Sequence, residues 1–209
     1  MPRPRSDIRS RILSAARKNF LQHGVTGASL RSIARGARTN IGMIYYYFKT
    51  KDDLFLAVVE EPYENVIADM EAALRGEGSL EERLVKFSTR LGQLTDLELD
   101  TLKLVLHEAL VSSARVPRLL ERFQRGHLAL VAAAIGEGRV SGQLRSELHP
   151  ALMVMVTLAV SGAPQAMRRV TGENFPFSDV PEGDAMSRQL IDMLMRGLSS
   201  PTQKKEVDP

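Results

Sequence analysis

The stretch 29–51 constrains the fold most, because it contains two short helical patterns separated by a break. Ser29 is a residue type that caps helices, and it precedes apolar residues at the spacing of one buried helix face: Leu30, Ile33, Ala34 and Ala37. Thr39 or Asn40 can cap a second helix, in which Ile44 and Phe48 share a face. Two helices joined by a three- or four-residue turn are typical of a helix-turn-helix, whose second helix enters the major groove of DNA.

The rest of the chain also has helical periodicity, and no segment alternates apolar and polar residues as a strand would. The sequence therefore predicts an all-α fold of about nine helices. Outside the helix-turn-helix we expect helices over 6–24, 51–75, 80–94, 96–113, 117–135, 150–160 and 184–198. Pro62 is expected to kink or split its helix, and Gly162 with Pro164 to interrupt the helix that begins at Pro150. Gly136 and Gly138 are interpreted as a helix end.

Charge is distributed unevenly along the chain. Residues 1–51 contain eleven Lys or Arg and one acid, a net charge of +10, whereas the remaining residues contain 17 bases and 24 acids, a net charge of −7. This division predicts a polyanionic partner for the N-terminal quarter. Charge alone does not distinguish DNA from RNA or from an anionic membrane as the partner. It also does not distinguish any of these from a basic surface that only faces solvent.

Three consecutive tyrosines, Tyr45, Tyr46 and Tyr47, distinguish the second helix of the motif. Adjacent positions spread these side chains over about 200° of a helix, so a small three-helix unit cannot bury all three. Exposed tyrosines can donate to phosphate oxygens and pack on sugars or thymine methyl groups. Gly42 would allow close approach to a DNA backbone, and Lys51 is placed to meet a phosphate near a helix start.

Composition and motifs limit the compartment, the membrane segments and the kinds of site that the sequence predicts. The chain has no cysteine, which favours a reducing cytoplasm, and no apolar segment follows the basic start, so no signal peptide is expected. The longest apolar run, 151–160, is shorter than the roughly 20 residues that span a bilayer, so a soluble protein without a membrane partner is predicted. The histidines lack ligand spacing, and no nucleotide-binding or nucleophile motif occurs, so neither metal, cofactor nor enzymatic activity is expected.

Polar residues on otherwise apolar helices leave two interpretations open, a solvent-facing surface or an effector pocket. The candidate pocket residues are Arg90, Thr101, His107, Glu108, Gln124 and His127. The apolar helix after Pro150 needs cover on more than one side, which favours burial in a subunit interface together with the helix at 184–198. Two alternatives to DNA binding are a helical protein-interaction adaptor and, less favoured, a small-molecule enzyme using His107 with Glu108.

The run from Ile33-Ala34 through Tyr45-Tyr46-Tyr47-Phe48 to Leu54-Phe55 closely resembles the TetR/AcrR family of transcriptional regulators. The resemblance covers about the first quarter of the chain, including Ala15-Ala16, Phe20 and Gly24 upstream. Arg38 stands where the family has a turn glycine, so either Arg38 takes the left-handed conformation or the turn differs.

The resemblance implies an all-helical homodimer joined by its last two helices, the eighth and ninth of those expected. It implies a helix-turn-helix domain over 1–51, an effector-binding and dimerisation domain over 52–199, and a polar tail over 200–209 that we expect to be disordered. It further implies a repressor that binds a palindromic double-stranded DNA operator and is released by a small-molecule effector of unknown identity. The DNA-facing positions would be Ser29, Asn40, Ile41, Gly42, Tyr45, Tyr46, Tyr47 and Lys51.

Overall fold

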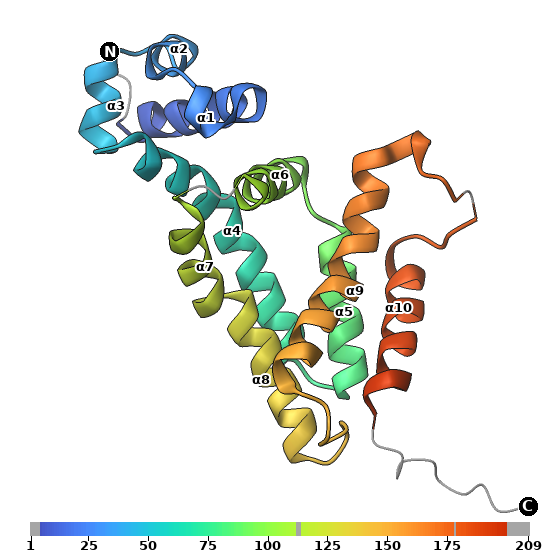
Figure 1. Cartoon of the computed structure of the whole chain (residues 1–209). Helices are drawn as coiled ribbons and strands as arrows, with labels where there is room; N and C mark the ends of the chain where they lie inside the picture. The colour runs from blue at the N-terminus through green and yellow to red at the C-terminus, as the bar shows by residue number, and fades with distance from the viewer. Residues whose placement is uncertain (1–4, 112–113, 178, 200–209) are drawn as a thin grey trace, which may run out of the picture. The chain divides into compact units, whose positions relative to one another are not determined.

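Helices form all the regular structure in a computed structural model that describes residues 5–111, 114–177 and 179–199 (Figure 1). The described residues contain ten α-helices and one short 3₁₀ helix, and an isolated bridge between Leu144 and Ser199 is the nearest approach to a strand among them. The α-helices are α1 (Arg5–Gly27), α2 (Leu30–Gly36), α3 (Ile41–Tyr47), α4 (Lys51–Arg75), α5 (Leu80–Gly92), α6 (Asp96–Leu110), α7 (Val116–Arg125), α8 (His127–Val140), α9 (Pro150–Thr171) and α10 (Gly183–Leu198). The predicted all-α fold class is confirmed.

The chain divides into two compact units. Unit 1 comprises Met1–Val66 and Thr95–Arg122, and unit 2 comprises Ile67–Leu94 and Phe123–Pro209. The predicted domain boundary at 51/52 falls within unit 1, at the start of α4. The predicted tail at 200–209 lies outside the described residues.

Capping side chains define several of the helix starts. The Ser79 hydroxyl accepts a hydrogen bond from the amide of Glu82, whose carboxylate accepts one from the amide of Ser79. Thr95 and Glu98 make the same reciprocal pair at the start of α6. Thr50 and Asp53 make this reciprocal pair at the start of α4. The hydrogen bonds from Thr50, together with the ion pair to Arg118, hold the pKa of Asp53 below its ordinary value.

Three expectations about helix breaks were wrong. The predicted helix over 117–135 is two helices, because Gly126 takes φ −104° and ψ −121° between α7 and α8. Helix α8 then continues through Gly136 and Gly138, which had been interpreted as its end. Helix α9 is continuous through Gly162 and Pro164. At Pro62 two outcomes were expected, and of these the split is excluded, because α4 runs as one helix from Lys51 to Arg75.

A neighbouring helix supplies a hydrogen bond near each internal proline, and at Pro62 that bond reaches the carbonyl that the proline leaves without a donor. Pro62 has no amide hydrogen, so the carbonyl of Val58 loses its donor within α4. Arg17 of α1, with only 8% of its surface exposed, donates from Nη2 to that carbonyl at 3.3 Å. In α9, the Ser88 hydroxyl of α5 donates at 3.2 Å to the carbonyl of Ser161, close to Pro164.

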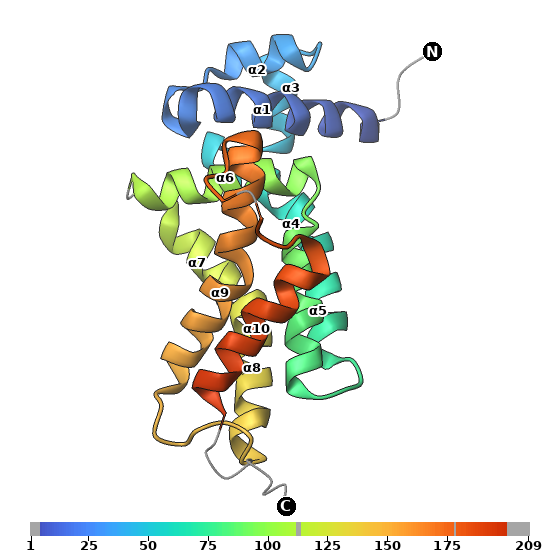
Figure 2. The ribbon, with the colours of Figure 1, turned by 90° about the vertical axis from the view of Figure 1, so that its right-hand side faces the viewer.

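Unit 2 places α9 and α10 side by side against α5 (Figure 2). Its core is formed by fully buried apolar side chains, among them Leu80, Leu84, Phe87, Val131, Ile135, Met153 and Ile191. One face of α9 points into this core with Met153, Thr157, Ser161 and Gln165, spaced four residues apart. The opposite face of α9 is exposed.

The partnership between Arg17 and Pro62 can be tested by a double-mutant cycle. Arg17→Met should lower the free energy of unfolding by about 1–2 kcal/mol, because the buried Val58 carbonyl loses its donor. In a Pro62→Ala background that cost should shrink by about 1 kcal/mol, because the new amide of residue 62 satisfies Val58. Urea denaturation measures each variant. Lys18→Met, at the exposed neighbouring position, is the control, and an equal cost of Arg17→Met in both backgrounds would contradict the assignment.

Candidate nucleic-acid interface

The turn between α2 and α3 has a glycine-type geometry built around an arginine. Arg38 adopts φ 53°, in the left-handed region. The amide of Arg38 donates to the carbonyl of Arg35 at 3.0 Å, and the amide of Thr39 donates to the carbonyl of Ala34 at 3.0 Å. These two bonds form a Schellman motif, in which the residue at the position of Arg38 is usually glycine. Of the two possibilities given by the sequence, the structure shows the first: Arg38 takes the left-handed conformation, which is unfavourable for a residue with a Cβ.

Asn40, of the two candidates, is the residue that caps α3. Its side-chain oxygen accepts a hydrogen bond from the amide of Met43 at 2.9 Å. Ser29 holds the capping position of α2, but its hydroxyl makes no capping bond and lies at the surface. Ser29 therefore has a donor available to another molecule.

Helix α3 buries Ile44 and Phe48 and presents tyrosine rings outward. Tyr45 is 54% exposed and Tyr46 is 66% exposed, whereas Tyr47 is partly covered. The rings of Tyr46 and Tyr47 meet edge to face, with centroids 5.1 Å apart. Packing between the rings restricts their motion and prepares an aromatic surface for contact with a flat or apolar partner.

Gly42 and Lys51 have partners within the protein. A Cβ at Gly42 would lie 3.1 Å from the Asn40 oxygen that caps α3, so glycine leaves room for the cap. The Lys51 ammonium donates to the carbonyls of Thr26 at 2.7 Å and Ala28 at 3.2 Å. It thereby holds the connection between α1 and α2 and retains one of its three N–H groups.

Four cations close to the motif were not among the predicted site residues. Arg31, Arg35, Arg38 and Lys49 are all exposed, and none of their side chains has a hydrogen bond or ion pair with another described residue. The charge division along the chain was the signal that could have identified them. Their side chains are available for electrostatic contact with a polyanion.

Comparisons with known proteins agree with this geometry. Residues 12–58 match the model of the "Bacterial regulatory proteins, tetR family". The chain is 40% identical over 77 residues to the transcriptional repressor NicS of Pseudomonas putida, a match that covers 32% of this chain and 36% of NicS. It is 25% identical over 169 residues to the repressor SCO4008 of Streptomyces coelicolor, covering 78% of this chain and 83% of that protein.

A solved structure extends the likeness to the whole fold. The regulator FadR from Bacillus subtilis, in complex with stearoyl-CoA, superposes with a TM-score of 0.73 at 19% identity, covering 90% of this chain and 98% of FadR. These matches, over the helix-turn-helix and over the fold as a whole, support a regulator of the TetR/AcrR family.

Arg115 joins the helix-turn-helix to the rest of unit 1, and we call its set of contacts the arginine clamp. Arg115 donates from Nε to Glu108 at 2.9 Å, from Nη1 to Asp52 at 2.8 Å and from Nη2 to Thr26 at 3.1 Å. Its guanidinium also lies 5.9 Å from the ring centroid of Phe55. One side chain therefore joins the end of α1, the start of α4 and the buried carboxylate of α6.

The six predicted effector residues are divided between the two units. Thr101, His107 and Glu108 belong to unit 1, whereas Arg90, Gln124 and His127 belong to unit 2. The Thr101 hydroxyl donates to Leu97, Glu108 pairs with Arg115, and Arg90 pairs with Asp69 at 2.7 Å. His107 and Gln124 are exposed, and burial lowers the pKa of His127 to about 4, so this imidazole is neutral at pH 7. Their role in effector binding stays a prediction.

The strain at Arg38 leads to a stability test. Arg38→Gly should raise the free energy of unfolding by about 1 kcal/mol, because glycine adopts positive φ without a Cβ penalty. Arg35→Gly is the matched control: it removes an equal charge from a helical position of α2 and should cost about 1 kcal/mol. Urea denaturation distinguishes the two, and destabilisation by both substitutions would contradict the strained turn.

Proposed function

We propose that this protein is a ligand-responsive repressor that binds a palindromic DNA operator as a homodimer. The observation that carries the proposal is the exposed aromatic surface of α3, flanked in the same unit by four cations that lack partners among the described residues. Repressor names among the relatives support the direction of regulation. Such a regulator acts in the cytoplasm, where its DNA is, and needs no catalytic activity or cofactor.

Each predicted DNA-facing residue has a role suited to its position. Tyr45 and Tyr46 contact base edges, sugars or phosphates, and Tyr47 supports Tyr46 through ring packing. Ser29 donates to a phosphate, and Asn40, Ile41 and Gly42 bring the start of α3 close to the DNA backbone. Lys51 positions the motif through Thr26 and Ala28 and offers its remaining N–H to a phosphate.

The exposed face of α9 supports dimerisation through α9 and α10. Leu152, Met155, Val156, Met167 and Val170 of α9 are between 45% and 64% exposed in a single copy, as is Met193 of α10, at 62%. The segment 150–174 is apolar and long enough to cross a membrane. Its most apolar 18-residue window has a mean hydropathy of 1.4, and 22% of that window is buried in a single copy. Interface helices of soluble proteins meet the same test, so a second copy accounts for this face without a bilayer.

Effector binding rests on family likeness. The related FadR structure contains stearoyl-CoA, which shows that this fold can hold a small molecule. An effector that binds the DNA-free form more tightly would release this regulator from its operator. Half-sites of the operator should lie about 34–36 Å apart, or somewhat more, to match a two-fold dimer.

The DNA interface is tested by Tyr46→Ala in a gel-shift titration on DNA flanking the gene. Specific binding should be lost, because Tyr46 is the most exposed ring of α3. Non-specific binding should keep its salt dependence, because no charge is removed. Tyr63→Ala changes the tyrosine outside α3 and should bind normally. Unchanged affinity of Tyr46→Ala would remove this residue from the interface, and absence of any specific complex at low salt would refute the proposed function.

The dimer interface is tested by Met155→Glu. A carboxylate at this exposed position of α9 would be desolvated in the proposed dimer, so the variant should be monomeric in size-exclusion chromatography with light scattering. Leu106→Glu, at a 52% exposed leucine of α6, should remain dimeric. A monomeric native protein, or a Met155→Glu variant that stays dimeric, would exclude this interface.

A further inference from the structure

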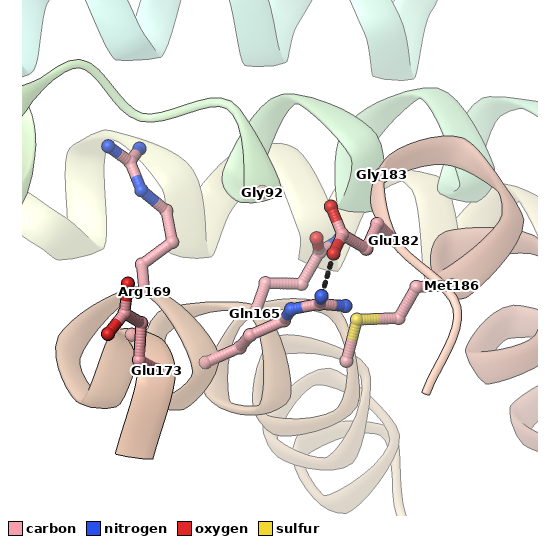
Figure 3. A pocket seen from close by; sticks show the side chains of 9 residues that line it. Gly92, Gln165, Arg169, Glu173, Glu182, Gly183 and Met186 are labelled. Carbon is pink, nitrogen blue, oxygen red and sulfur yellow. Dashed lines mark hydrogen bonds and ion pairs between the residues drawn. The ribbon is translucent and has the colours of Figure 1, made fainter. Parts of the chain in front are cut away.

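Charge balance distinguishes the pocket of unit 2 from the helix-turn-helix. The pocket, of about 490 Å³, lies where the ends of α5 and α9 meet the start of α10 (Figure 3), and none of the six residues predicted for an effector site lines it. Its charged lining residues are two arginines and two glutamates: Arg168, Arg169, Glu173 and Glu182. They leave no net charge for a ligand to complement. The helix-turn-helix has no such balance.

The segment that contains the helix-turn-helix has cations but no carboxylates. Neither Asp nor Glu occurs between Asp7 and Asp52. The two carboxylates that border the segment are bound, since Asp7 pairs with Arg11 at 3.4 Å and Asp52 pairs with Arg115 at 2.8 Å. An unpaired cation of this segment therefore has no carboxylate nearby in the sequence, and another molecule can supply its anionic partner.

Arg38 is one of these cations, at the start of α3. Its backbone takes φ 53°, which glycine adopts more readily, and the Schellman bonds of the turn use only backbone groups that glycine also has. The arginine side chain is exposed and makes no hydrogen bond, ion pair or ring contact with another described residue. Nothing that its side chain contacts in the described part of the chain offsets the strain, and such a residue is a candidate for a functional role.

Arg9 lies at the opposite end of α3. It precedes Ala16 by seven residues and Phe20 by eleven, so it shares their buried face of α1 and is directed toward the motif. Its guanidinium carbon lies 5.8 Å from the ring centroid of Phe48, the residue that ends α3. Arg9 is nevertheless exposed and has no hydrogen bond or ion pair with another described residue. The ring therefore orients the guanidinium without using any of its five N–H groups.

We propose that Arg9 and Arg38 bind backbone phosphates of DNA at the two ends of α3. The seven residues of α3 rise about 10 Å, close to the major-groove width of about 12 Å, so a helix in the groove has its ends near the phosphates at the groove edges. Guanidinium groups suit this contact, because their paired N–H groups match two phosphate oxygens. The inference rests on the proposed DNA binding, and it assigns to these arginines the positioning of α3 rather than the reading of bases.

The test is the salt dependence of DNA binding, measured with the full-length protein by fluorescence anisotropy between about 50 and 200 mM KCl. Two labelled duplexes are compared, the DNA flanking the gene and a duplex of the same composition in shuffled order. Arg9→Gln and Arg38→Gly should each reduce the slope of log binding constant against log salt concentration by about 0.9, and the double variant by about 1.8. The reductions should be equal on both duplexes, because phosphates carry no sequence information.

Lys18→Gln is the matched control. Lys18 is exposed on α1 nine residues after Arg9, about 180° around the helix, so its loss removes the same charge away from α3 and should leave the slope unchanged. Arg9→Lys keeps the charge but loses the planar group that stacks on Phe48, so binding should weaken several-fold at an unchanged slope. Arg38→Gly should bind more weakly although its fold is more stable, which excludes unfolding as the cause.

The outcomes distinguish these contacts from the proposed function. Equal affinity for the two duplexes would contradict sequence-specific regulation, whereas reduced slopes in the same experiment would still support the phosphate contacts. Unchanged slopes in Arg9→Gln and Arg38→Gly, or reductions no larger than that of Lys18→Gln, would overturn the contacts even if the flanking DNA binds specifically. Absence of a complex with either duplex would refute both.

Discussion

The four-way contact of Arg115 is the interaction on which unit 1 depends. Three nitrogens of one planar guanidinium bind three separate segments, at Thr26, Asp52 and Glu108. Lysine could not replace it, because an ammonium is a point charge without the rigid fork that reaches several acceptors at once. Glu108 is only 1% exposed, so loss of Arg115 would leave this buried carboxylate without a closely bonded cation and would be strongly destabilising. The orientation of the helix-turn-helix and the burial of α6 are therefore linked through one side chain.

Local signals in the sequence were sufficient for most helix starts, because a cap and its partner lie within three residues of each other. Ser79 with Glu82 and Asn40 before α3 are examples that the structure confirms. Helix interruptions were predicted less well, because their outcome depends on residues far away in the chain. Pro62 is accommodated by Arg17, 45 positions earlier, and the Ser161 carbonyl of α9 accepts a hydrogen bond from Ser88 of α5. Neither partner can be recognised from sequence spacing, since it is the packing of neighbouring helices that brings the donor to the carbonyl.

The candidate site residues show the same contrast between what local sequence predicts and what depends on packing with distant residues. Helical geometry alone predicted that the three tyrosines cannot all be buried, and the exposure of Tyr45 and Tyr46 confirms it. Polar residues on apolar helices were harder to interpret, because one position on a helix can serve solvent, an ion pair or a cavity. Glu108 and Arg90 have ion-pair partners, and the pocket of unit 2 is lined instead by Gln165 and Gly92. Gln165 carried no signal in the sequence, because the pocket that it lines is formed by helices far apart in the chain.

Gly42, Lys51 and Arg38 show why a family motif does not by itself assign a role to each of its residues. Gly42 leaves room for the Asn40 cap, and Lys51 binds the carbonyls of Thr26 and Ala28, so both shape the motif before any DNA is present. Arg38 departs from the usual glycine and adopts the strained conformation nonetheless, because the Schellman bonds and the packing of α3 require it. Substitution of Gly42 or Lys51 would therefore weaken DNA binding even without a lost DNA contact. The exposed tyrosine rings are a sharper probe of the interface, since removing Tyr46 leaves the turn, the cap and the clamp intact.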